Sequence, residues 1–200
     1  MKAFADKIGM THAYDERGRH GAVTVLKLKK TVLCGKKKSE IDGYAADIYA
    51  LIDEKRPARK SIVSKYKEAK NARSMVEQKL SDDASQIEVG KPIGIGDFAV
   101  GDKVAAYGVS KGKGFAGTVK RHGFTTGPKT HGSCNYRKPG SIGPTSPSRV
   151  IKGRRMAGHM GATNVKVKNL VVVYVDEVNN SIWVKGSIPG APKSQVVVEK

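Results

Sequence analysis

The chain has 200 residues, and 37 Lys and Arg against 18 Asp and Glu give it a formal net charge of +19 at pH 7. This excess is beyond what solubility requires and is typical of chains that associate with nucleic acid or an anionic membrane. No stretch approaches the roughly 18 apolar residues of a membrane span, and the basic residues lie among Gly and Pro rather than on an amphipathic helix. A membrane partner is therefore disfavoured.

The hydrophobic content is 38%, which is modest for a chain long enough to bury a real core. One domain with a non-globular excursion fits this composition best. Residues 1–11 contain no apolar region of the kind that a secretory signal requires, so a cytoplasmic location is predicted. Because a reducing compartment disfavours disulfides, Cys34 and Cys134 are predicted to be free thiols.

The first half of the chain indicates short strands separated by turns. β-branched and apolar runs predict strands at 22–28 and 44–52, and residues 61–80 suit a helix or a single turn followed by a strand. Gly, Pro and Asp then supply turn signals from 89 to 103, before a further strand at 104–109. Closely spaced short strands are typical of a small barrel.

The strand pattern stops after residue 110 and returns near residue 165. Three strands are predicted at 165–175, 182–188 and 195–198, with turn-forming residues between them. Residues 1–110 and 162–200 are therefore predicted to form one β-barrel domain, and residues 111–161 to leave it and return. A connection of this length is far beyond an ordinary loop, and we interpret it as functional.

The connection lies in an acid-free region. Residues 103–175 contain no Asp or Glu but fourteen Lys or Arg. Such a segment cannot neutralise itself, so it should stay extended until a polyanion orders it. The basic residues are Lys103, Lys111, Lys113, Lys120, Arg121, Lys129, Arg137, Lys138, Arg149, Lys152, Arg154, Arg155, Lys166 and Lys168.

Several motifs in this region resemble cofactor or metal sites. Residues 112–117 match the glycine pattern of dinucleotide-binding folds, but no acid for the ribose occurs before Asp176. Residues 123–130 resemble a phosphate-binding loop, yet Pro128 removes a needed N–H donor. His131 and Cys134 would supply only two of the four ligands of a structural zinc. No cofactor and no metal are predicted.

Catalysis is also disfavoured, because the segment holds no carboxylate that could orient a His or act as a general base. The chain is therefore predicted not to be an enzyme and to have no small-molecule substrate. Among the aromatic residues, Trp183 is interpreted as a core residue. Phe115 and Phe124 could pack or stack on bases, and we favour packing for both.

Five blocks carry a family resemblance. In chain order they are Ser110–Phe124, Thr130–Ser133, Arg137–Gly143, Arg149–Gly161 and Val184–Gly190. Together with Lys7–Thr11 they resemble the bacterial-type large-subunit ribosomal protein L3 family. The region from 36 to 85 contributes little to this resemblance.

The resemblance implies a mainly β fold: a six-stranded barrel of the translation-protein type, with a long irregular basic extension inserted between strands. It also implies a structural role in the large subunit, with early assembly on ribosomal RNA and an extension that runs toward the peptidyl transferase centre. The partners would be large-subunit rRNA and neighbouring ribosomal proteins. Some bacterial relatives carry a methylated Gln where this chain has His159, so that modification is not expected here.

Two sets of site residues follow. Arginines 137, 149, 154 and 155 are the first choices for specific contacts, because a guanidinium can bridge phosphates or lie flat on bases. The predicted RNA-binding residues are Lys111, Lys113, Lys120, Arg121, His122, Lys129, His131, Arg137, Lys138, Arg149, Lys152, Arg154, Arg155 and His159. The predicted tip of the extension comprises Gly143, Pro144, Thr145, Ser146, Pro147 and Ser148.

Two other classes of protein remain as alternatives at this point. An enzyme acting on nucleic acid could use the basic segment as a substrate groove, and a free-standing architectural protein could use it to bind DNA. The lack of clustered carboxylates or metal ligands in the segment argues against the enzyme. Association with large ribosomal subunits would separate the DNA-binding alternative from the ribosomal one.

Overall fold

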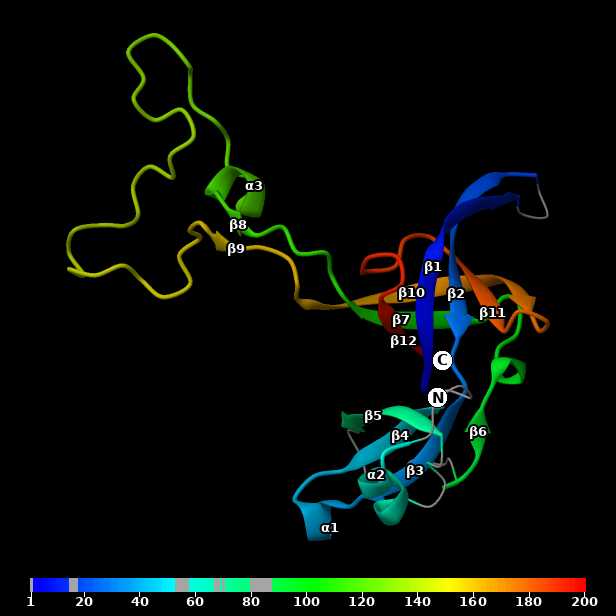
Figure 1. Cartoon of the computed structure of the whole chain (residues 1–200). Helices are drawn as coiled ribbons and strands as arrows, with labels where there is room; N and C mark the ends of the chain where they lie inside the picture. Colours follow the sequence, from blue (N-terminus) through cyan, green and yellow to red (C-terminus); the bar gives the residue numbers. More distant parts are fainter. Residues whose placement is uncertain (1, 15–17, 53–57, 67–68, 70, 80–87) are drawn as a thin grey trace. The chain divides into compact units, whose positions relative to one another are not determined.

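The computed structural model describes residues 2–14, 18–52, 58–66, 69, 71–79 and 88–200. Contacts divide the chain into two units, one formed by Met1–Val109 with Asn164–Lys200 and the other by Ser110–Thr163. We call the first the globular unit and the second the arm. The structure is mainly β, as the sequence predicted (Figure 1).

The globular unit contains a closed sheet of six strands in the order β1–β12–β7–β10–β11–β2. Every pairing is antiparallel, and β2 pairs with β1, so that each strand has two neighbours. The strands are β1 (Lys2–Tyr14), β2 (His20–Leu28), β7 (Lys103–Val109), β10 (Asn164–Asp176), β11 (Ser181–Lys185) and β12 (Gln195–Glu199).

Bulges allow the long strands to bend around this sheet. β1 shifts register between Lys7 and Gly9, and β10 shifts between Val167 and Leu170. At the second shift Asn169 has φ 59, a left-handed conformation that Asn tolerates better than most residues. Each extra residue sharpens the local bend and twist, which lets a 13-residue strand pair with a different neighbour at each end.

A second sheet holds the central part of the first half, in the order β5–β4–β3–β6. Its strands are β3 (Thr31–Lys37), β4 (Ala46–Ile52), β5 (Ala72–Lys79) and β6 (Pro92–Ile93). Short helices α1 (Ser39–Asp42) and α2 (Lys60–Lys65) lie between these strands, and a 3₁₀ turn, η2 (Ile95–Asp97), follows β6.

This second sheet was not predicted from the sequence, which indicated one β-barrel domain from residues 1–110 and 162–200 and left the structure of 36–85 open. The strand predicted at 44–52 exists as β4, but it pairs with β3 and β5 instead of joining the closed sheet. The closed sheet instead includes β1, which was not predicted from the sequence. Its sequence mixes Ala, Gly, Asp and Lys with few β-branched residues, so local propensity gives little strand signal there.

One hydrophobic core serves both sheets. Phe4, Leu26 and Ile182 of the closed sheet are fully buried, and they share a cluster with Tyr49 and Leu33 of the second sheet. The Phe4 and Tyr49 rings lie 5.6 Å apart between centroids in a tilted arrangement. Alternate residues of β3, Val32 and Cys34, face a smaller cluster on the other side. Period-two alternation thus buries both faces of β3.

Trp183 does not belong to this core, so its interpretation as a core residue was wrong. It is half-buried between Ile182 and Val184, which are fully buried, and its ring packs edge-on against Tyr174 at 5.4 Å. The alternation of β11 places it on the outer face. As predicted, neither cysteine forms a disulfide: Cys34 is buried and Cys134 is exposed.

A charged cluster joins β12, β10 and β7 of the closed sheet. The Lys166 amine lies 2.8 Å from the Glu199 carboxylate, and the Tyr107 hydroxyl donates to the same carboxylate. Partial burial acts to raise the pKa of Glu199, but hydrogen bonds from Lys166 and Tyr107 outweigh it and hold that pKa below 4.5. Because the folded state lowers this pKa, the cluster stabilises the fold above pH 4.5, and this stabilisation is lost as the pH falls further.

We therefore expect Glu199→Gln to lower the Tm at pH 7 by about 2–4 °C, corresponding to an ion pair on a half-buried surface. The control is Glu177→Gln, which removes the same charge from an exposed turn. Thermal unfolding followed by circular dichroism at pH 7 and at pH 3 checks this. A Tm difference between wild type and Glu199→Gln that stays the same at pH 3 would contradict the assignment.

Candidate nucleic-acid interface

The arm starts and ends as a pair of antiparallel segments. Ser110 donates its N–H to the Thr163 carbonyl at 2.9 Å, and Ala162 donates to the Ser110 carbonyl at 3.2 Å. Further out, Lys113 donates to Met160 at 2.8 Å and Met160 donates to Gly114 at 2.9 Å. We call residues 110–116 with 158–163 the base of the arm. Strands β8 (Phe115–Ala116) and β9 (Gly158–His159) continue its pairing.

A short helix, α3 (Thr118–His122), follows the base and ends at Gly123. Gly123 has φ 69 in the left-handed region, and its N–H donates to Val119 at 3.0 Å, which is a common helix end. The sequence predicted an irregular extension at 111–161, but β8, α3 and β9 show that part of this segment is regular. Three basic residues in its last turn complement the helix dipole.

Two predicted RNA-binding side chains hold the returning strand of the arm. The Arg121 guanidinium donates to the Met156 carbonyl at 2.7 Å, and His122 Nε2 lies 2.9 Å from the same oxygen. Gly158 allows this approach, since a Cβ there would lie 2.7 Å from Arg121 Nη1. Arg121 and His122 thus have a role inside the arm, and their contact with RNA stays a prediction.

Beyond this point the arm is a long exposed loop with no layered core (Figure 1). Residues 137–155 are all exposed, including the predicted tip at 143–148. The predicted RNA-binding residues are exposed as well, except for the half-buried His122. Since the arm contains no Asp or Glu, none of its cations can form an ion pair within it. The positive charge of the arm is therefore not neutralised by acids of the arm itself.

A few contacts shape the outer part of the arm. The Arg154 guanidinium donates to the Ser141 carbonyl at 2.6 Å and so joins the outgoing and returning segments. The Lys129 amine lies 5.4 Å from the centroid of the Tyr136 ring. At the tip, Ser148 has φ 49 and donates its N–H to Thr145 at 3.0 Å. These contacts are local, and none of them joins the outer part of the arm to a hydrophobic core.

The two phenylalanines of the arm differ in their surroundings. Phe115 is 80% exposed, so the prediction that it packs within the chain was wrong. Phe124 is half-buried, and its ring centroid lies 6.0 Å from that of His122. An exposed Phe next to basic residues presents a face on which a base can stack.

The glycine-rich motif at 112–117 lacks the parallel βαβ unit of dinucleotide-binding folds. It contains β8, which pairs antiparallel with β9. Among the described residues, no three His, Cys, Asp or Glu come close enough to hold a metal ion. Within the same residues, no helix has the length and apolar character needed to cross a bilayer.

We expect most of the arm to exchange its amide hydrogens quickly in the isolated protein. Residues 123–155 have few backbone hydrogen bonds, whereas the amides of Lys113 and Met160 in the base are paired. Hydrogen–deuterium exchange with mass spectrometry measures both regions, with the β-strands of the globular unit as the protected reference. Strong protection throughout 123–155 would contradict this expectation.

Comparison with known proteins gives a consistent result. The family model for ribosomal protein L3 matches residues 68–180. The large ribosomal subunit protein uL3 of Shouchella clausii is 40% identical over 193 residues, covering 96% of this chain and 94% of that protein. The uL3 proteins of Bacillus thuringiensis and Bacillus cereus are each 41% identical over 199 residues, covering 96% of this chain and 93% of theirs. The chain therefore belongs to the ribosomal protein L3 family.

Proposed function

We propose that this chain binds large-subunit rRNA through its arm, helps to begin assembly of the subunit, and extends the arm toward the peptidyl transferase centre. Its relatives are named large ribosomal subunit proteins, and membership of their family makes it a structural ribosomal protein, not an enzyme. One observation carries the proposal: residues 137–155 are exposed throughout, basic and free of acid.

The proposal assigns separate roles to two parts of the chain. Residues 1–110 and 162–200 would form the folded anchor, and its closed sheet would be the six-stranded barrel of the translation-protein type. Residues 111–161 would be the part that penetrates folded RNA. The paired base supports this division because it fixes where the arm begins and ends.

The physical basis of binding is neutralisation of phosphate charge. Each Lys or Arg that contacts a phosphate releases counterions, so ten contacts give a log–log salt slope on the order of −7 to −9. Gly and Pro within the arm permit an irregular backbone that can follow folded RNA, whose deep, narrow major groove excludes side chains. The entropy cost of ordering the arm is offset only when RNA is present.

The missing carboxylates fit the same picture. In packed RNA an Asp or Glu would face phosphates on several sides, and burying such like charges together is costly. A protein that only needed solubility could carry acids anywhere. The whole arm lies within the acid-free residues 103–175, which supports a surrounding of phosphates along it.

The test is co-sedimentation of the labelled full chain with large ribosomal subunits reconstituted in its presence and then washed in high salt. We expect the chain to remain with the large subunit and to be absent from small subunits. An architectural DNA-binding protein would instead be removed by the wash. A magnesium-dependent nuclease assay on RNA and DNA is the accompanying check, and cleavage would contradict the structural role.

A further inference from the structure

The base of the arm contains a short two-stranded ribbon whose faces differ. Ala116 of β8 is 3% exposed, whereas Phe115, its neighbour in the strand, is 80% exposed. Because successive side chains of a strand point to opposite faces, β8 has a covered face and an open face. Phe115 pairs across the ribbon with the exposed His159 of β9, so both rings belong to the open face. The open face thus presents a phenyl ring to the surroundings of the chain.

The backbone around Phe115 is held by hydrogen bonds. The Lys113 N–H donates to the Met160 carbonyl at 2.8 Å, and the Met160 N–H donates to the Gly114 carbonyl at 2.9 Å. The pairing of β8 with β9 continues this ladder through Phe115 itself. A partner that binds the ring therefore loses less conformational entropy to ordering than a partner that binds the outer loop of the arm.

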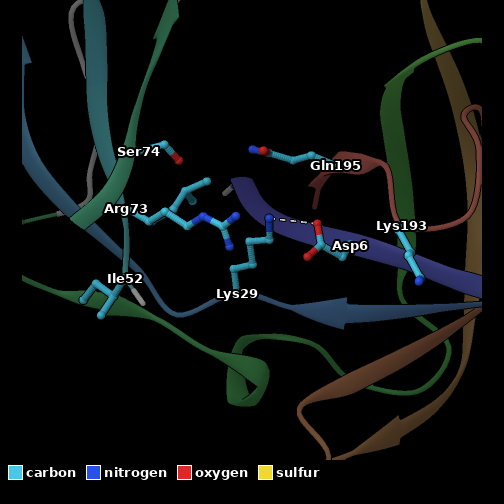
Figure 2. Close-up of a pocket in the computed structure, with 8 residues that line it drawn as sticks. Asp6, Lys29, Ile52, Arg73, Ser74, Lys193 and Gln195 are labelled. Carbon is cyan, nitrogen blue, oxygen red and sulfur yellow. Dashed lines mark ion pairs between the residues drawn. The ribbon is translucent and has the colours of Figure 1, made fainter. Parts of the chain in front are cut away.

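The charges of the arm favour a polyanion as that partner. In the globular unit, the Lys29 amine lies 2.8 Å from the Asp6 carboxylate, an ion pair that Figure 2 shows at a cavity of this unit. Lys166 is paired with Glu199 at the same distance. The arm contains no Asp or Glu, and among the described residues no ion pair includes one of its Lys or Arg. The surroundings of Phe115 therefore suit a phosphate backbone.

Within a polyanion, the exposed ring suits a nucleobase. A protein partner would bind a contiguous apolar patch, but Gly114, Ala116 and His159 add no exposed apolar side chain beside Phe115. Stacking needs only the face of one ring, because every nucleobase has a π-face. Bases within a duplex are already stacked on their neighbours, so an aromatic side chain stacks on an unpaired base.

We propose that Phe115 stacks on one unpaired nucleobase of large-subunit rRNA at the base of the arm. His159 borders this nucleobase, and its imidazole can donate a hydrogen bond to the nucleobase edge or to a neighbouring phosphate. This inference rests on the proposed function. It adds a contact that depends on stacking, whereas the other contacts proposed for the arm depend on charge.

The salt dependence of binding separates stacking from charge. For the full chain and large-subunit rRNA, Phe115→Ala should weaken binding on the order of tenfold at every salt concentration. The log–log salt slope should not change, since a phenyl ring releases no counterions. Lys113→Gln should instead make the slope less steep by about 0.7–0.9. Val178→Ala removes another exposed apolar side chain, in the globular unit, and should change neither quantity.

These measurements distinguish two failures. Wild-type affinity in Phe115→Ala would overturn the stacking proposal and leave the proposed function intact, provided that the wild type binds with a steep salt slope. Lack of salt-dependent rRNA binding by the wild type would overturn the proposed function itself. Exchange of the Lys113 and Met160 amides should be unchanged in Phe115→Ala. Faster exchange would show that the ring stabilises the base of the arm and would also overturn stacking.

Replacement of the ring identifies what it contacts. Phe115→Tyr should bind as the wild type does, and Phe115→Leu, which keeps apolar volume without an aromatic face, should bind as weakly as Phe115→Ala. Full affinity of the Leu variant would overturn stacking in favour of an apolar contact. In reconstituted large subunits, p-benzoylphenylalanine in place of Phe115 should crosslink to an rRNA nucleotide on illumination. A crosslink to a neighbouring protein alone would overturn the assignment to a nucleobase.

Discussion

Changing Arg154 and Arg155 together to Glu is expected to prevent the chain from entering large ribosomal subunits while leaving the globular unit folded. Both side chains are exposed on the returning segment of the arm, outside the globular unit. Two lost charge-assisted contacts, each worth about 1.5–3 kcal/mol, should weaken binding to rRNA on the order of 100-fold or more. Repulsion between the new carboxylates and phosphate adds to this loss.

Sucrose-gradient analysis of reconstituted subunits measures incorporation, and circular dichroism of the free protein measures folding. Lys27→Glu with Lys60→Glu is the matched control, since it reverses two charges at exposed positions of the globular unit. Arg154→Gln alone separates a second effect, because it removes the donor to the Ser141 carbonyl without adding negative charge. Normal incorporation of the double Glu variant would refute the role assigned to this pair.

The parts of the fold that could be predicted are those with strong local patterns. β-branched runs gave β2, β7, β10, β11 and β12 close to their observed bounds. β1 was missed because its small and charged residues form a strand only through pairing with β2 and β12. The second sheet could not be inferred either, since strand patterns specify pairing partners poorly when several strands compete.

The exposed cations of the candidate site were evident from composition alone, because a long acid-free region is rare and needs no tertiary information. Contacts between residues that are distant in the sequence were not evident in this way. Nothing in the local sequence shows that Arg121 and His122 both hold the Met156 carbonyl. The end of α3 did carry a signal, a Gly directly after three basic residues.

Gly161→Ala is expected to open the base of the arm. Gly161 has φ +77, and a Cβ built there would lie 2.1 Å from the Lys111 carbonyl oxygen and 3.0 Å from Gly112 Cα. Both neighbours are backbone atoms, so no side chain can move aside to make room. The base must separate instead, which breaks the pairing of Lys113 with Met160. Exchange of these two amides should accelerate at least tenfold, which corresponds to about 1.4 kcal/mol of lost local stability.

Gly153→Ala is a control matched in backbone strain. Gly153 has φ +86 in the outer part of the arm, but a Cβ there would meet no atom within 4 Å. Both substitutions place Ala in the left-handed region, which destabilises the folded state by about 1–2 kcal/mol. Only Gly161→Ala adds a steric clash. If the amides of Lys113 and Met160 exchange faster in Gly161→Ala but not in Gly153→Ala, the close approach of the two segments is the cause. Equal exchange rates of these two amides in both variants would mean that backbone strain explains the change in rate and that the base does not depend on this contact.

An open base no longer fixes the start of the arm. Incorporation into large subunits should therefore decrease in Gly161→Ala, together with the protection of these amides, and remain near normal in Gly153→Ala.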